Sequence, residues 1–249
     1  MPFAPILRAV SCLLALAGSC RSNQPGDVPP APRARATSGG EMHWDVNEVV
    51  LEPVQPDPSC GIDVADLVQA LSSEASVWND ALVGCVAPHL RISAPRAGGA
   101  SRLDGHNLVV VLCHRWCPAD GASAPCYDPT AQAITHLRPY EEGRGPRAAE
   151  IREADVEING VSFRWSPSGD RDGTRSLRAA LAHEIGHVLG LDDVCARTAG
   201  EHRAACSARM KTSIMYPDPT EEGRDLVVVP SADAVRGLCT PARSASPPP

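Results

Sequence analysis

The sequence predicts a mixed α/β or α+β fold in which helices pack on a mixed, twisted sheet. Two long stretches, Asp63 to Val83 and Arg175 to Leu189, have the apolar spacing of helices, and a third, shorter helix is expected near the C-terminus. Several β-prone runs lie between them, including the buried run Leu-Val-Val-Val-Leu at 108–112. Helices and strands do not alternate strictly, so a purely parallel βα arrangement is not predicted.

The helices are predicted from their apolar faces and end signals. In Asp63 to Val83, seven apolar residues recur at helical spacing: Val64, Leu67, Val68, Leu71, Ala75, Trp78 and Leu82. For Arg175 to Leu189 we expect Thr174 as the N-cap and Gly190 as the stop. The last helix, Ser231 to Leu238, begins at the capping residue Ser231.

Short runs rich in β-branched residues predict the strands of the sheet. The expected strands are His43 to Val54, Leu90 to Ile92, Asn107 to Cys113, Ala131 to Leu137 and Asp155 to Ile158. Cys113 to Pro129 is rich in Cys and Pro and is expected to be a loop.

Composition divides the 249 residues into four parts. Residues 1–19 are expected to be a signal peptide, 20–40 a flexible linker rich in Pro, Ala, Ser and Gly, 41–240 one folded domain, and 241–249 a disordered tail. The net charge is −7 and no block of basic residues occurs, so nothing in the sequence favours nucleic acid as a partner. We expect a monomer.

The N-terminus predicts export. Arg8 precedes the apolar run Ala9 to Ala17, which is too short to span a bilayer. Cleavage after the A-x-A segment at 15–17 would release a soluble, secreted protein. Alternatively, Ala17-Gly18-Ser19-Cys20 resembles a bacterial lipobox, which implies a lipid anchor at Cys20 and an outer-membrane lipoprotein.

The cysteine count agrees with export. Of ten cysteines, eight remain if Cys12 leaves with the signal and Cys20 carries lipid. An even set in an exported protein predicts four disulfides. The loop length favours a local pair between Cys195 and Cys206. A zinc site on Cys113 and Cys117 is less well supported, because no second pair stands at the required spacing.

The chemistry of the chain is expected in one short segment, residues 183–193. His183 and His187 are four residues apart, so both imidazoles project from one face of the expected helix and fit two corners of a zinc tetrahedron. Gly190 permits a sharp turn, after which Asp193 returns as a third ligand, whereas Asp192 is one residue short. Glu184 is placed to act on water at the fourth position.

The pattern His183-Glu-x-x-His187-x-x-Gly190-x-x-Asp193 resembles the metzincin zinc peptidases, with Asp as the third ligand. Ser213 to Pro217 is similar to the Met-turn of the matrixin branch, in which Met215 would lie in a hydrophobic base below the metal. Weaker similarities extend the resemblance over about Trp44 to Leu238. It implies a zincin domain with an active-site helix and a smaller C-terminal subdomain.

The resemblance implies a zinc-dependent endopeptidase with Glu184 as general base on zinc-bound water, His183, His187 and Asp193 as ligands of one catalytic Zn²⁺, and an extended protein or peptide as substrate. The strand Ala131 to Leu137 would be the edge that binds substrate, by analogy with the family. Calcium is left open, because no loop motif for it occurs.

Two alternatives remain on the sequence alone. Pro58 to Asp63 loosely resembles a cysteine switch, in which Cys60 would bind the zinc, although an even cysteine set favours a disulfide for Cys60. The chain as a whole could be a non-catalytic zinc-binding surface lipoprotein on a metzincin scaffold, although it retains both histidines and Glu184.

Overall fold

A computed structural model describes residues 29–37, 39–118, 125–140, 147–195, 207–217 and 229–240 of the chain. Within these residues, five strands form one sheet in the order β2-β1-β3-β5-β4. Its strands are β1 Glu48–Pro53, β2 His89–Ile92, β3 Asn107–Leu112, β4 Ala133–Pro139 and β5 Ile151–Asn159. Only β4 runs antiparallel to its neighbour, so the predicted mixed sheet is confirmed.

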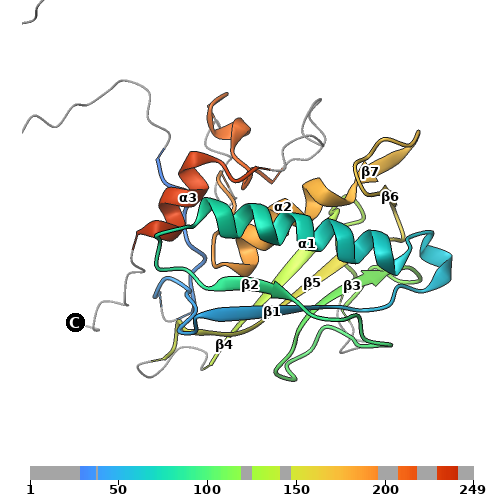
Figure 1. Cartoon of the computed structure of the whole chain (residues 1–249), viewed down its shortest axis with the longest axis horizontal. Helices are drawn as coiled ribbons and strands as arrows, with labels where there is room; N and C mark the ends of the chain where they lie inside the picture. Colours follow the sequence, from blue (N-terminus) through green and yellow to red (C-terminus); the bar gives the residue numbers. More distant parts are fainter. Residues whose placement is uncertain are drawn as a thin grey trace, which may run out of the picture.

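One face of the sheet is covered by two helices, α1 Val64–Ala81 and α2 Leu177–Val188 (Figure 1). Leu67, Leu71 and Trp78 of α1 are fully buried, as the apolar spacing predicts. The indole of Trp78 donates a hydrogen bond to the carbonyl of Ala182, at 2.9 Å, and so joins α1 to α2. The core between the helices and the sheet therefore fixes the helix that carries the predicted metal ligands.

The two faces of β5 differ in chemistry. Ala154, Val156 and Ile158 belong to the core on the helix side, whereas the alternating residues Glu153, Asp155 and Glu157 are buried on the other face. In the antiparallel register, Thr135 of β4 is opposite Val156, so Thr135 also stands on the helix side.

The structure corrects the predicted N-cap of α2. Thr174 does not cap α2, because it lies in the short strand β7 Thr174–Ser176, which pairs with β6 Arg164–Ser166. Ser176 is the N-cap, and its hydroxyl accepts a hydrogen bond from the amide of Ala179. The remaining elements are α3 Ala232–Cys239, with Ser231 as its N-cap residue, and two short 3₁₀ helices, Pro58–Cys60 and Met210–Thr212.

Residues 29–37, 39 and 40, expected to be part of a flexible linker, pack on the domain instead. The segment lies beside α3 (Figure 1), where the amide of Ala31 donates to the carbonyl of Asp233 at 2.9 Å. Arg33 forms an antiparallel bridge with Leu191 and donates from its side chain to the carbonyl of Leu238. The linker prediction is therefore wrong for these residues, while the signal peptide, the tail and the other boundaries stay predictions.

Three disulfides join parts of the described chain: Cys60–Cys113, Cys85–Cys239 and Cys117–Cys126. This confirms the disulfide for Cys60 and excludes a shared metal site on Cys113 and Cys117, which belong to different pairs. Cys195 is also disulfide-bonded, but Cys206 lies outside the described residues, so their pairing stays a prediction. Disulfides in this number are typical of proteins exported to an oxidising compartment.

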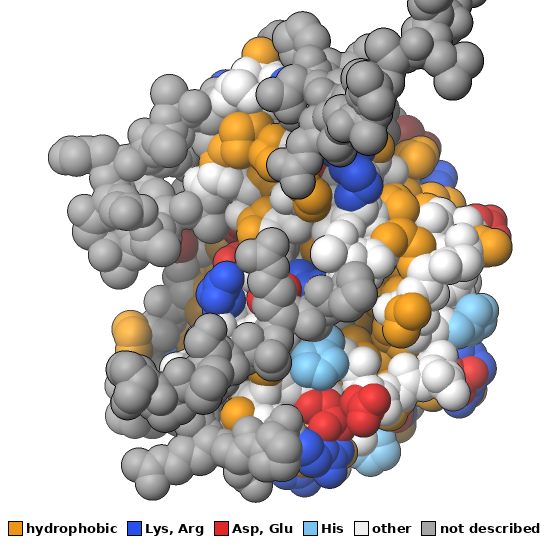
Figure 2. All heavy atoms as spheres, turned by 90° about the vertical axis from the view of Figure 1, so that its left-hand side faces the viewer, with side chains coloured by type: hydrophobic (Ala, Val, Ile, Leu, Met, Phe, Trp, Pro, Cys, Tyr) orange, Lys and Arg blue, Asp and Glu red, His pale blue; other side chains and the backbone are white. Residues whose placement is uncertain are grey.

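The part of the chain that the structure describes contains no helix long and apolar enough to cross a bilayer. On the face shown in Figure 2, hydrophobic, acidic and basic side chains are intermixed among the coloured residues.

Candidate metal centre

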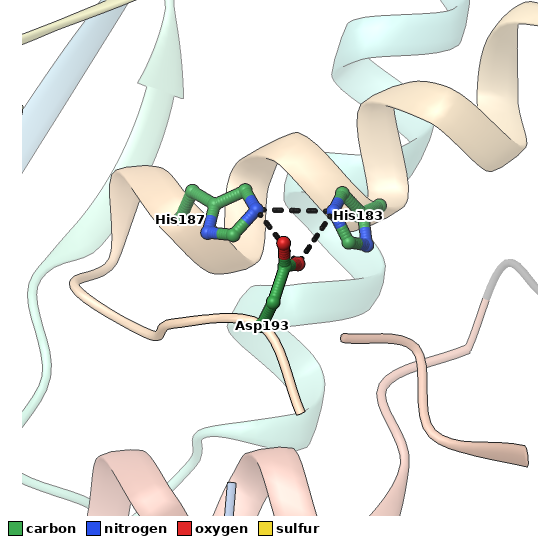
Figure 3. Close-up of side chains that lie close together, drawn as sticks. All are labelled: His183, His187 and Asp193. Carbon is green, nitrogen blue, oxygen red and sulfur yellow. Dashed lines mark hydrogen bonds and ion pairs between the residues drawn. The ribbon is translucent and has the colours of Figure 1, made fainter. Parts of the chain in front are cut away.

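The end of α2 sets the geometry of the site. Gly190 has φ +96°, the amide of Gly190 donates to the carbonyl of His187 at 2.8 Å, and that of Leu191 to the carbonyl of Gly186 at 3.0 Å. These two bonds form a Schellman motif, in which a left-handed glycine ends the helix and reverses the chain. The predicted stop at Gly190 is confirmed, and the reversal brings Asp193 back toward the histidines (Figure 3).

Both histidines are held by backbone carbonyls. Nδ1 of His183 lies 2.7 Å from the carbonyl oxygen of Ile214, and Nδ1 of His187 lies 2.9 Å from that of Leu191. Because a carbonyl can only accept, each Nδ1 carries the hydrogen, and the neutral ring then presents a lone pair at Nε2. The two Nε2 atoms are 3.0 Å apart and face one another (Figure 3).

Asp193 completes a triangle with these nitrogens. Its Oδ1 lies 3.3 Å from Nε2 of His183 and 3.3 Å from Nε2 of His187. Neither contact is an N–H···O hydrogen bond, and this buried oxygen has no hydrogen-bond partner among the described residues. Two imidazole nitrogens and one carboxylate oxygen thus converge on one point.

The triangle fits a zinc ion. Tetrahedral zinc with bonds of 2.0–2.1 Å has ligand atoms about 3.3 Å apart, which is close to the three separations observed here. His183, His187 and Asp193 are also a group of His, Cys, Asp or Glu residues whose ligand atoms all lie within 4.8 Å of one another. The donor set and the spacing therefore suit a metal with a fourth position left open.

The electrostatics of the cluster favour positive charge. Burial disfavours the imidazolium of His187, but the carboxylates of Asp193 and Glu184 outweigh it and raise the pKa of His187 to about 9. Burial alone would raise the pKa of Asp193, yet the two imidazoles hold it far below its usual range. A cation, whether a proton or a metal ion, is therefore stabilised among these three side chains.

Glu184 lies beside the cluster without belonging to the triangle. It is a buried residue of α2, and its Oε2 accepts a hydrogen bond of 2.6 Å from the hydroxyl of Thr135 in β4. Both residues line a cleft of about 830 Å³, together with residues 130–134 and the three members of the triangle. β4 is the end strand of the sheet, so this cleft runs along a sheet edge.

Met215 packs against α2 at Gly186. It is fully buried, and a Cβ added at Gly186, between the two histidines, would overlap its sulfur atom. The turn at 213–215 is joined to α3 through the hydroxyl of Ser213, which donates to Oδ2 of Asp233 at 2.6 Å and accepts from the amide of Met215 at 3.2 Å. Since Ile214 of the same turn holds His183, this network positions one corner of the triangle.

The structure places the five expected site residues close together. His183, His187 and Asp193 form the triangle, Glu184 and the triangle line one cleft, and Met215 packs against α2. Asp192 is exposed, and its carboxylate accepts a bond from the amide of Asp193. The sequence placed Ser213 in the expected Met-turn and Thr135 in the expected edge strand, but it did not predict the contacts of Thr135 with Glu184 or of Ser213 with Asp233, which join elements far apart in the chain.

Fold and site together define a mixed α/β protein with a His-His-Asp cluster of metal-ligand type in a cleft beside an edge strand. Neither a protein-family model nor a curated protein matches the sequence. Among solved structures, a similar one is metalloproteinase-II from Bacteroides fragilis, with 14% identity and a TM-score of 0.35 over 87% of this chain. The match spans 58% of that protein. A likeness of this size leaves the function to be argued from the site itself.

Proposed function

We propose that this chain is a zinc-dependent endopeptidase that hydrolyses peptide bonds in extended protein substrates. The observation that carries the proposal is the triangle of His183, His187 and Asp193, whose edges of 3.0, 3.3 and 3.3 Å match one face of a zinc tetrahedron. The carboxylate of Glu184 stands next to it in the same cleft.

The metal ligands, Glu184 and β4 have different roles in the proposed hydrolysis. A bound zinc ion would supply Lewis acidity, which acidifies water and polarises the scissile carbonyl. Glu184 accepts a proton from the attacking water as the carbon–oxygen bond forms, and returns it to the amine as the carbon–nitrogen bond breaks. The outer edge of β4, which is the end strand of the sheet among the described residues, would hold the substrate backbone as an added strand and present one peptide bond to the cleft.

We further propose a matrixin-like metzincin, exported as a secreted protein or an outer-membrane lipoprotein. Supporting features are Gly190 in the left-handed conformation, the buried Met215 against Gly186, and the disulfides. None of these depends on the comparison with the solved structure.

The test uses the oxidised protein, loaded with zinc and incubated with casein, alongside Glu184→Gln. We expect wild type to cleave casein, to lose activity with a chelator and to regain it with zinc. Glu184→Gln should keep about one zinc per chain and lose at least about 100-fold in rate, because its amide cannot accept the proton.

Zinc-loaded wild type without activity would contradict the proposed enzyme and favour a non-catalytic zinc-binding protein. Retention of more than a few per cent of the rate in Glu184→Gln would overturn the role of that residue.

A further inference from the structure

We propose that Thr135 is a positioning residue for Glu184, an inference that rests on the proposed function. Oγ1 of Thr135 lies 2.6 Å from Oε2 of Glu184, and it lies 3.4 Å from the backbone carbonyl of the same residue. The shorter distance is typical of a hydroxyl that donates to an ionised carboxylate, a bond about twice as strong as one between neutral groups.

The place of Thr135 in the sheet explains why it reaches this carboxylate. It is opposite Val156 in the register of β4 and β5, and therefore stands on the face of the sheet that α2 covers. Its neighbours on that face, Ala133 and Leu137, are two residues away on either side and have no polar side-chain atom. Thr135 is thus the residue of β4 that can donate from its side chain to Glu184.

Threonine is suited to hold a fixed direction. Its branched Cβ restricts χ1, so the hydroxyl is presented with less rotational freedom than that of serine. β4 in turn is hydrogen-bonded along its length to β5, from Ala133 to Pro139. The donor is therefore anchored by the sheet, whereas the acceptor is on the helix that carries His183 and His187.

The consequence concerns which oxygen of Glu184 acts as base. With Oε2 occupied by Thr135, the second oxygen is left to receive a proton from water, and the carboxylate cannot rotate freely about its last torsion. Misplacement of a catalytic group by about 1 Å can reduce a rate about 100-fold. Loss of the hydroxyl should therefore slow the chemical step and leave substrate binding largely unchanged.

The test compares Thr135→Val, which keeps the shape and removes the hydroxyl, with Thr135→Ser, which keeps the hydroxyl. In the zinc-loaded enzyme we expect Thr135→Val to lower kcat on the order of tenfold, with KM, zinc content and Tm close to wild type. Thr135→Ser should retain most of the wild-type kcat. A purely structural role would instead change Tm or zinc content and would not be rescued by serine.

A second measurement does not depend on turnover. Acetohydroxamic acid binds zinc through its oxygens and passes its proton to a nearby carboxylate, so its Kd reports on the placement of Glu184. We expect Thr135→Val to weaken binding several-fold in the wild-type background and to have no effect in a Glu184→Ala background, which gives a double-mutant cycle with a clear coupling.

The two measurements separate the two hypotheses. If wild type binds zinc but cleaves nothing, the proposed function fails, while the hydroxamate cycle still decides the role of Thr135. If wild type is active and Thr135→Val equals it in kcat and in hydroxamate Kd, the positioning role is wrong. An equal loss in Thr135→Ser, or a loss in Thr135→Val explained by missing zinc, overturns it as well.

Discussion

Two adjacent aspartates have opposite surroundings at the scale of single residues. Asp193 places Oδ1 3.3 Å from both Nε2 atoms, while Asp192 is exposed and caps the amide of Asp193 at 2.9 Å. We predict that Asp193→Ala lowers zinc affinity at least about 100-fold, because a ligand atom is lost and not merely reoriented. Asp192→Ala is the matched control and should leave zinc affinity near wild type.

Competition with a chromophoric chelator and elemental analysis of both variants measure this difference. Full zinc occupancy in Asp193→Ala at low free zinc, or metal loss in Asp192→Ala alone, would reverse the assignment.

The sequence predicts this part of the site well because its geometry is local. Helical spacing aligns His183 and His187, and a glycine at 190 ends the helix at a known distance before Asp193. No local rule predicts the contact of Thr135 with Glu184. The two residues are 49 positions apart in the chain, and only the packing of α2 on the sheet edge brings them together.

At the scale of elements, the N-terminal segment supports the turn that carries Asp193. The amide of Ala34 donates to the carbonyl of Gly190 at 3.0 Å, and the amide of Asp192 donates to the carbonyl of Pro32 at 2.8 Å. The same segment packs tightly on α3, where a Cβ added at Gly237 would lie 2.5 Å from the carbonyl oxygen of Ala31. The segment thus packs between α3 and the turn that carries Asp193.

We predict that Gly237→Ala destabilises the protein, although alanine is favoured over glycine in a helix by about 1 kcal/mol. The added methyl group must displace backbone, and overpacking of this kind typically costs about 1–3 kcal/mol. Gly98→Ala is the matched control, because nothing lies within 4 Å of a Cβ there. Thermal unfolding and zinc affinity measure the effect. An unchanged Tm in Gly237→Ala would contradict the prediction, because it would show that the N-terminal segment moves away from the methyl group without a loss of stability.

Composition alone could not reveal this segment. It is rich in Pro and Ala, and it is held mainly by backbone hydrogen bonds, which leave no apolar pattern in the sequence. The misplaced N-cap of α2 has a similar cause. Thr174 and Ser176 are both good caps, and both belong to β7, a strand of three residues that is too short to recognise in the sequence.

At the scale of the whole molecule, the mixed sheet is predicted from the order of helices and strands, but its strand order and the disulfide pairing are not. Eight cysteines allow 105 connectivities, and only the fold brings Cys85 beside Cys239 across 154 residues. The burial of the acidic residues on the face of β5 opposite the helices could not be predicted either. The alternation of acidic and apolar residues in 153–158 is typical of a strand with one face exposed to solvent.

These acids make global stability depend on pH. Asp155 is fully buried, and burial raises its pKa to about 6, although the amide of Leu108 and the guanidinium of Arg138 favour its ionised form. The folded protein therefore binds this proton more tightly than the unfolded chain. The stabilisation is fully present below pH of about 4, the usual pKa of Asp, and is lost as pH rises through the folded pKa.

Asparagine at 155 cannot ionise, so the stability of wild type minus that of Asp155→Asn should fall between pH 4 and pH 6, by up to about 3 kcal/mol. Urea unfolding of both proteins at several pH values gives this difference. A chelator is present throughout, so that both proteins are free of metal and the separate effect of acid on metal binding is removed. Oδ1 of asparagine can still accept from the amide of Leu108, which Asp155 does at 2.8 Å, so the fold should be retained. A difference that stays constant or rises over this range would mean that Arg138, 2.9 Å from Oδ2, outweighs burial and keeps Asp155 ionised.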